Sequence, residues 1–125
     1  MSGPDSAIAL VLLAEDDRDV CSLLARGLRE DGYAVLTAHD GAAALAVLES
    51  LVSPADVLVT DVTMPRLRGD RLALLALARG LARHVLFITG GAVHAADVPI
   101  SGPILPKPLS PATLSQAVAK VLVGA

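Results

Sequence analysis

Hydrophobic residues along the chain fall into short continuous runs and longer segments with helical spacing. The short runs predict strands buried on both faces of a sheet, at residues 7–14, 33–38, 56–60, 84–89 and 104–106. In the longer segments apolar residues recur every three or four positions, which predicts helices at residues 20–30, 41–51, 70–80 and 110–123. This alternation predicts an α/β fold with helices on both faces of a doubly wound, five-stranded parallel sheet.

The segment between the last two predicted strands breaks this alternation. Residues 90–103 show little periodicity and contain several glycines and prolines, so the fourth helix of such a fold is expected to be shortened or missing. The length of 125 residues suits one domain. We place that domain at residues 7–123, after a flexible tail at residues 1–6.

The composition excludes several classes of protein. A net charge of −3 does not provide the basic surface of a nucleic-acid binder. The single cysteine, Cys21, excludes an internal disulfide and fits a cytoplasmic location. No apolar run approaches the roughly 20 residues that cross a bilayer, so we expect no direct membrane contact. Aromatic residues make up only 2% of the chain, so the core must be built from aliphatic side chains.

Polar side chains stand at the carboxyl ends of four predicted strands, and such ends meet at one edge of a parallel sheet. Clustered carboxylates repel one another unless a cation joins them, and oxygen ligands suit Mg²⁺. A lysine and a hydroxyl beside them can bind phosphoryl oxygens, so the set predicts phosphoryl transfer to a carboxylate. The residues are Glu15, Asp16 and Asp17 after the first strand, Asp61 after the third, Thr89 at the end of the fourth and Lys107 after the fifth.

Each of these residues also has a purely structural interpretation when it is taken alone. The acidic triplet is typical of a helix N-terminus, and Asp61 could form an Asx-turn. Thr89 could be an ordinary strand-end hydroxyl, and Lys107 a surface lysine. Their joint occurrence, each at the end of a different predicted strand, favours a shared site.

Four segments resemble the signature segments of the response-regulator receiver domain of two-component signalling. They are LLAEDDRDV at 12–20, TDVTMPRLRGD at 60–70, FITG at 87–90 and LPKPLSPATL at 105–114. The resemblance covers residues 7–123 and implies the flavodoxin-like receiver fold. The chain looks most like receivers attached to hybrid histidine kinases and like single-domain receivers.

The resemblance implies a role for each candidate residue. Asp61 would be the phosphoacceptor, modified by a histidine kinase or a histidine phosphotransfer protein. Magnesium would be held by Asp16 directly, by Glu15 through water, by Asp61 and by the backbone carbonyl of Thr63. Phosphoryl oxygens would be bound by Thr89 and Lys107.

Further positions follow from the same alignment of segments. Asp17 would fall outside the acidic pair, at the start of the first helix. The peptide Lys107–Pro108 would be cis, as it usually is in this family. Ile104 stands where most receivers carry an aromatic residue that moves on activation, so the usual switch is expected to be absent or altered.

The resemblance implies a signalling phosphoacceptor whose conformation and partner binding change on phosphorylation. Its only catalysis would be slow self-catalysed phosphorylation and dephosphorylation, and a monomer is favoured. An alternative is a receiver-like interaction module that works without phosphorylation. A small phosphatase is a third hypothesis, but an enzyme of the haloacid dehalogenase type would need a second acid where Thr63 stands.

Overall fold

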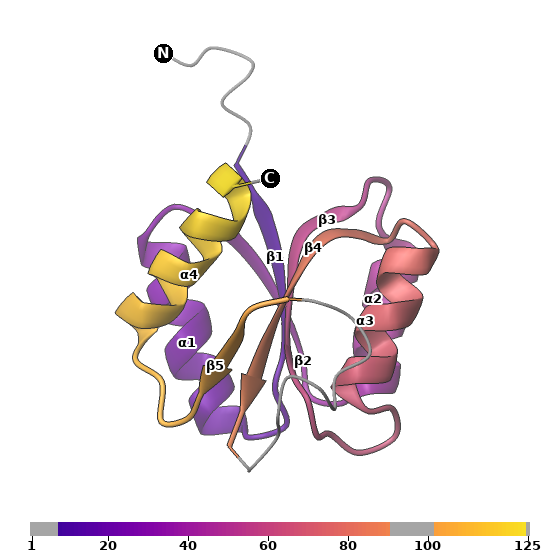
Figure 1. Cartoon of the computed structure of the whole chain (residues 1–125), viewed down its shortest axis with the longest axis horizontal. Coiled ribbons are helices and arrows are strands. Elements are labelled where there is room, and N and C mark those ends of the chain that lie inside the picture. The colour runs from indigo at the N-terminus through magenta and orange to yellow at the C-terminus, as the bar shows by residue number, and fades with distance from the viewer. Residues whose placement is uncertain (1–7, 91–101, 125) are drawn as a thin grey trace.

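The computed structural model describes residues 8–90 and 102–124, which form three layers. In chain order the elements are β1 (Leu10–Ala14), α1 (Arg18–Glu30), β2 (Ala34–Ala38), α2 (Gly41–Ser50), β3 (Ala55–Asp61), α3 (Gly69–Ala78), β4 (Ala82–Thr89), β5 (Ile104–Pro106) and α4 (Pro111–Gly124). The strands form one parallel sheet in the order β2-β1-β3-β4-β5. Helices α1 and α4 cover one face of the sheet, and α2 and α3 cover the other (Figure 1).

The predicted fold class is confirmed by this arrangement. All five strands were expected, and the four helices of the described residues match the four that the periodicity predicted. The expected shortening or loss of a helix at residues 90–103 concerns a segment of which residues 91–101 lie outside the described residues. The predicted tail at residues 1–6 also lies outside them.

Several predicted boundaries were wrong by two or three residues. Helix α1 begins at Arg18 rather than residue 20, because the Asp17 carboxylate caps it by accepting hydrogen bonds from the backbone N–H groups of Asp19 and Val20. Strand β4 begins at residue 82 rather than 84, because backbone pairing with β3 extends the strand beyond its most apolar residues. Strand β1 begins at residue 10, where its pairing with β2 begins.

Two hydrophobic clusters form the core, one on each face of the sheet. Successive strand residues point to opposite faces, so each central strand contributes to both clusters. The α2 and α3 side contains Leu12, Leu58, Phe87, Leu48 and Leu72. The α1 and α4 side contains Leu13, Val59, Ile88, Leu24 and Leu114. Because the three central strands carry no polar side chain in their buried middle, polar groups are confined to the strand ends.

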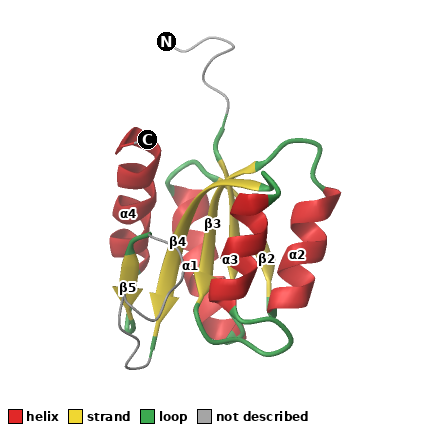
Figure 2. Cartoon of the chain, turned by 45° about the vertical axis from the view of Figure 1, so that its right-hand side comes forward, coloured by secondary structure: helices red, strands yellow, loops and turns green. Residues whose placement is uncertain are grey.

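All strands point the same way, so their carboxyl ends lie together at the lower edge of the molecule (Figure 2). The loops that follow β1 and β3 begin at this edge, and so does the loop from β5 to α4. Within the described residues, no helix combines the length and apolar character needed to span a membrane. Parallel sheets of this kind bind ligands beyond the carboxyl ends of their strands.

Candidate functional site

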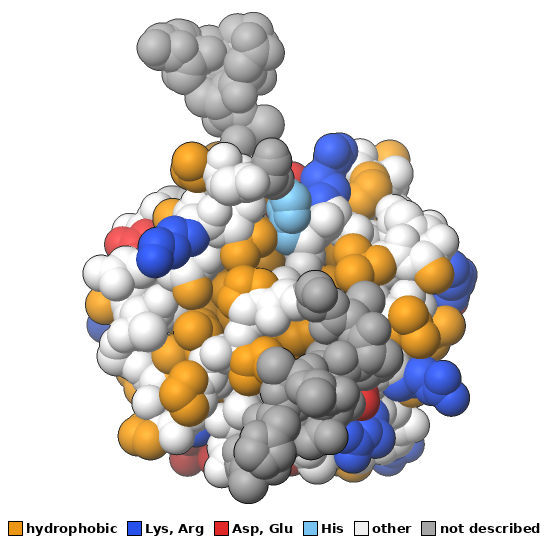
Figure 3. Space-filling model, in the orientation of Figure 1, with side chains coloured by type: hydrophobic (Ala, Val, Ile, Leu, Met, Phe, Trp, Pro, Cys, Tyr) orange, Lys and Arg blue, Asp and Glu red, His pale blue; other side chains and the backbone are white. Residues whose placement is uncertain are grey.

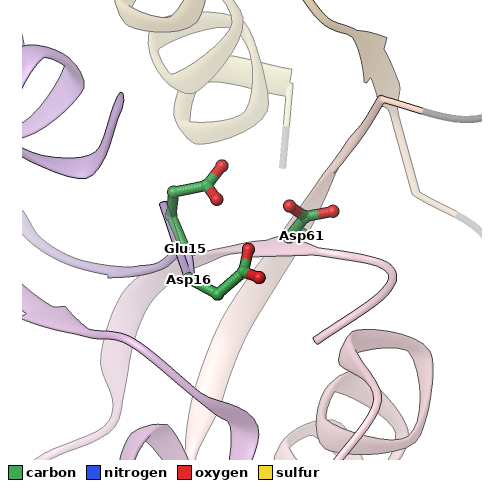
Figure 4. Close-up of side chains that lie close together, drawn as sticks. All are labelled: Glu15, Asp16 and Asp61. Carbon is green, nitrogen blue, oxygen red and sulfur yellow. The ribbon is translucent and has the colours of Figure 1, made fainter. Parts of the chain in front are cut away.

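Three carboxyl groups meet at the carboxyl edge of the sheet. Glu15 and Asp16 directly follow β1, and Asp61 is the last residue of β3. The two strands are neighbours, with Ala14 paired to Thr60, so the residues that follow them come together. Oxygen atoms from the three carboxyl groups lie within 4.8 Å of one another. Figure 4 shows the three groups turned toward one shared space, with Glu15 and Asp61 buried and Asp16 exposed.

Lys107 reaches this acidic cluster from the loop after β5, two strands away from β3. Its Nζ lies 2.8 Å from Oδ2 of Asp61 and 2.6 Å from Oε1 of Glu15. The side chain passes Gly90, where an added Cβ would lie 3.4 Å from Cδ of Lys107. A small residue at position 90 therefore leaves room for the lysine. The Lys107–Pro108 peptide is cis, as the resemblance implied.

The remaining predicted residues are placed at the same edge. Thr89 is buried at the end of β4, one residue beyond the Asp61–Ile88 pair, and its carbonyl accepts a hydrogen bond from the Lys107 backbone N–H. Thr63 lies two residues after Asp61, in the loop from β3 to α3. Asp17 caps α1 and is not a member of the acidic cluster, as the resemblance implied.

The electrostatics of the cluster follow from burial and from like charge. Burial raises the pKa of Glu15, and the nearby Asp61 carboxylate adds to the effect, although Lys107 and the Asp17 backbone N–H oppose it. Burial lowers the pKa of Lys107, but its contacts with Asp61 and Glu15 outweigh burial and the net pKa lies above the ordinary value. The lysine is therefore an ammonium at neutral pH, shared between two carboxyl groups.

The donor set fits a hard divalent cation. All three side chains offer carboxyl oxygens, the ligand type that Mg²⁺ prefers. Oε1 of Glu15 is buried and lies close to Nζ of Lys107, but no described group gives it a well-aligned hydrogen bond. The short distance allows charge pairing without a directed bond, so this oxygen keeps a lone pair for water or metal. A cation would also reduce the repulsion between the carboxylates.

The raised pKa of Glu15 predicts how stability changes with pH in the metal-free protein. The ordinary pKa of this carboxyl group is 4.5. At pH values between 4.5 and the raised pKa of the folded state, Glu15 is protonated to a greater extent in the folded protein than in the unfolded chain. Its contribution to stability is therefore complete below pH 4.5 and is lost as the pH rises through the folded pKa. Each tenfold change in proton affinity corresponds to about 1.4 kcal/mol.

The measurement compares the parent with Glu15→Gln by urea unfolding in a metal chelator, from pH 4.5 to 8. We expect the stability of the parent relative to the variant to fall as the pH rises through the folded pKa of Glu15 and then to level off. Glu49→Gln serves as a control, because that carboxyl group is exposed and pairs with Arg79 at the surface. The prediction would be contradicted if the free energy of unfolding of the parent, minus that of Glu15→Gln, stayed constant or increased with pH.

Two residues at the site edge were not found from the sequence. Thr60 is buried, and its hydroxyl donates a hydrogen bond to the carbonyl of Asp61. His39 directly follows β2, and its Nδ1 is 3.1 Å from the carbonyl oxygen of Glu15. The three histidines of the sequence do not have the spacing typical of a metal site. The position of His39 in the sequence could have indicated its place at the site, because it follows a strand that ends at the same edge of the sheet.

The described surface has two apolar grooves, one of which borders the site. One, of about 490 Å³, runs between α1 and the loop after β5, and its lining comprises Val20, Leu23, Leu24, Lys107, Pro108 and Leu109. The other, of about 320 Å³, lies between β5 and α4 and includes Leu105, Ala117 and Val121. Figure 3 shows hydrophobic side chains gathered over β5 and its junction with α4. The first groove is bordered by Lys107, so a partner seated there would be close to Asp61.

Fold and site together define a doubly wound α/β domain with an acid-and-lysine centre at the carboxyl edge of its sheet. The family model of the response regulator receiver domain matches residues 11–119, and the chain belongs to this family. Receivers are signalling domains of two-component systems, and they interact with kinases or phosphotransfer partners. The sequence-based recognition of the family is thereby confirmed.

Individual relatives agree with this assignment. The receiver protein CpdR of Brucella abortus is 34% identical over 119 residues, covering 92% of this chain and 98% of CpdR. The sensor kinase CckA of the same organism is 33% identical over 121 residues, covering 94% of this chain but 13% of the kinase.

Solved structures show the same fold. The receiver domain of the hybrid histidine kinase CckA has a TM-score of 0.74 and 37% identity, covering 91% of this chain and 99% of that domain. The chemotaxis response regulator CheY4 of Vibrio cholerae has a TM-score of 0.81 and 28% identity, covering 93% of this chain and 100% of CheY4.

Proposed function

We propose that the chain is a phosphoacceptor receiver in which Asp61 accepts a phosphoryl group from a histidine kinase or a histidine phosphotransfer protein. The observation that carries the proposal is the placement of Asp61, which is buried at a strand end, 2.8 Å from the Lys107 ammonium and within 4.8 Å of two other carboxyl groups. A cytoplasmic location and a monomeric state remain predictions.

The roles of the residues follow from charge and position. A carboxylate oxygen of Asp61 forms a bond to phosphorus, while the bond from phosphorus to the donor breaks and the donor leaves with its electron pair. Lys107 pairs with the phosphoryl oxygens, and the Thr89 hydroxyl donates a hydrogen bond to them. Glu15, Asp16, Asp61 and the carbonyl of Thr63 would hold Mg²⁺, which when bound neutralises phosphoryl charge.

The groove beside Lys107 supports a protein as the phosphoryl donor. It is mostly apolar, and Leu23 on its rim is 55% exposed although it is a large hydrophobic residue. Exposed apolar residues that border a reactive group are typical of partner-binding surfaces. A helix of the donor protein seated between α1 and the loop after β5 would bring its phosphohistidine to Asp61.

The test is intact-mass spectrometry after incubation with acetyl phosphate and Mg²⁺. We expect one phosphoryl adduct, which is absent when the metal is chelated beforehand. A folded protein that forms no adduct with acetyl phosphate is then incubated with phosphorylated histidine phosphotransfer proteins. Failure with both donors would contradict the proposal and favour the interaction module that works without phosphorylation, a role that the altered switch position at Ile104 would suit.

A further inference from the structure

The junction between β2 and α2, residues His39–Gly41, contacts both loops that carry the proposed metal ligands. On one side it contacts the loop after β1, where Glu15 and Asp16 lie. On the other side it contacts the loop after β3, where the backbone N–H of Gly41 lies 3.4 Å from the carbonyl of Pro65 and Asp40 lies 3.5 Å from the guanidinium of Arg66. The junction therefore joins two loops that are far apart in the sequence.

The contact with the acidic loop depends on a side chain. The main chain of Glu15 is bound twice, because its N–H donates to the carbonyl of Ala38 at 3.0 Å and its carbonyl faces Nδ1 of His39 at 3.1 Å. A carbonyl oxygen only accepts hydrogen bonds, so Nδ1 of His39 must carry the proton. The imidazole is half-buried, which limits competition from water for this bond.

The peptide that His39 holds joins Glu15 to Asp16. Glu15 is also fixed by burial and by Lys107, whereas Asp16 is exposed and its side chain interacts with that of Glu15. Rotation of that peptide would move the Asp16 carboxyl group away from Asp61. Loss of the His39 contact would thus loosen one ligand of the acidic cluster without touching any of the three carboxyl groups.

We propose that His39 is a positioning residue of the metal site, and that its Nδ1–H bond to the Glu15 carbonyl keeps Asp16 opposite Asp61. The inference rests on the proposed function, because it concerns the Mg²⁺ affinity of that same centre. Groups that orient metal ligands typically contribute about tenfold or more to metal affinity. The role belongs to the hydrogen bond of the ring nitrogen and not to its charge.

The test compares Mg²⁺ binding by the parent, His39→Leu and His39→Asn, with the dissociation constant taken from NMR titration with Mg²⁺ alone. Leucine and asparagine have nearly the same branched shape, but only asparagine places an N–H donor where Nδ1 stands. We expect His39→Leu to weaken binding about tenfold and His39→Asn to restore it to within about twofold of the parent. Thermal unfolding checks that each variant is folded, and His39→Ala replaces the leucine variant if that one is not.

Equal affinity of the parent and His39→Leu would overturn the proposal. Equal weakening by leucine and asparagine would overturn it too, because the ring would then act by shape and not by its hydrogen bond. Failure of the proposed function gives a different result, in which the parent itself neither binds Mg²⁺ nor accepts a phosphoryl group.

Discussion

Asp61→Asn is expected to abolish the phosphoryl adduct that acetyl phosphate and Mg²⁺ give on the parent. The amide nitrogen of asparagine is not a nucleophile under these conditions. The Glu15 carboxylate, which also contacts Nζ of Lys107, is fully buried and should not replace Asp61 as the acceptor. The substitution would also remove one ligand charge from the metal cluster. The loss should be complete within the sensitivity of intact-mass spectrometry.

A matched control lies on the same strand. Asp56 is at the opposite end of β3, where its carboxylate accepts a hydrogen bond from the Leu10 N–H at 2.7 Å, far from the carboxyl edge. Asp56→Asn keeps an accepting oxygen and should be phosphorylated like the parent. An adduct on Asp61→Asn, or equal loss of the adduct in both variants, would show that Asp61 is not the specific acceptor.

Gly69→Ala is expected to lower the free energy of unfolding by about 3 kcal/mol or more, at the upper end of the cost of overpacking. A Cβ at this position would overlap the backbone carbonyl oxygen of Asp61 and would lie 2.8 Å from Oγ1 of Thr60. The first contact is with backbone, so the strand end must shift. The backbone N–H of Gly69 also donates to the carbonyl of Val62, which ties the start of α3 to this loop.

Urea unfolding measures this effect, with Gly124→Ala as the control. An added Cβ at Gly124 meets nothing within 4 Å, so that variant should stay within about 0.5 kcal/mol of the parent. Because the Asp61 carbonyl must move in Gly69→Ala, the rate of phosphorylation should fall as well. Equal stability of Gly69→Ala and the parent would mean that α3 can slide away from β3 at little cost.

Much of the site could be predicted because the strands themselves leave no place for polar side chains. A continuous apolar run such as 57–59 needs burial on both faces, and the first acid after it must lie at the strand end. This reasoning placed Glu15, Asp61 and Thr89 correctly at the carboxyl edge. The helix caps at Asp40 and Ser110 are equally local, because each side chain accepts a hydrogen bond from the backbone N–H group three residues later.

The contacts that cross the fold could not be predicted in the same way. His39 and Glu15 are 24 residues apart, and nothing in the spacing of either residue indicates that an imidazole faces a carbonyl. The close approach of Gly69 to Asp61 is also invisible in the sequence, where it is one glycine in a loop. The start of α1 was misplaced because the three acids in a row have similar local preferences, and only the fold separates a capping acid from a buried one.

The sequence by itself determined the local elements, the parallel α/β class and the edge at which polar side chains gather, because hydrophobic periodicity and strand direction depend on neighbouring residues. Tertiary structure decided which of those polar groups touch. The order β2-β1-β3-β4-β5 brings β1 beside β3, so that Glu15 and Asp16 meet Asp61. It also lets Lys107 reach across β4 to pair with the carboxyl groups of Glu15 and Asp61. Lys107 and Asp61 are 46 residues apart in the sequence, so their contact depends on strand order and not on any local pattern.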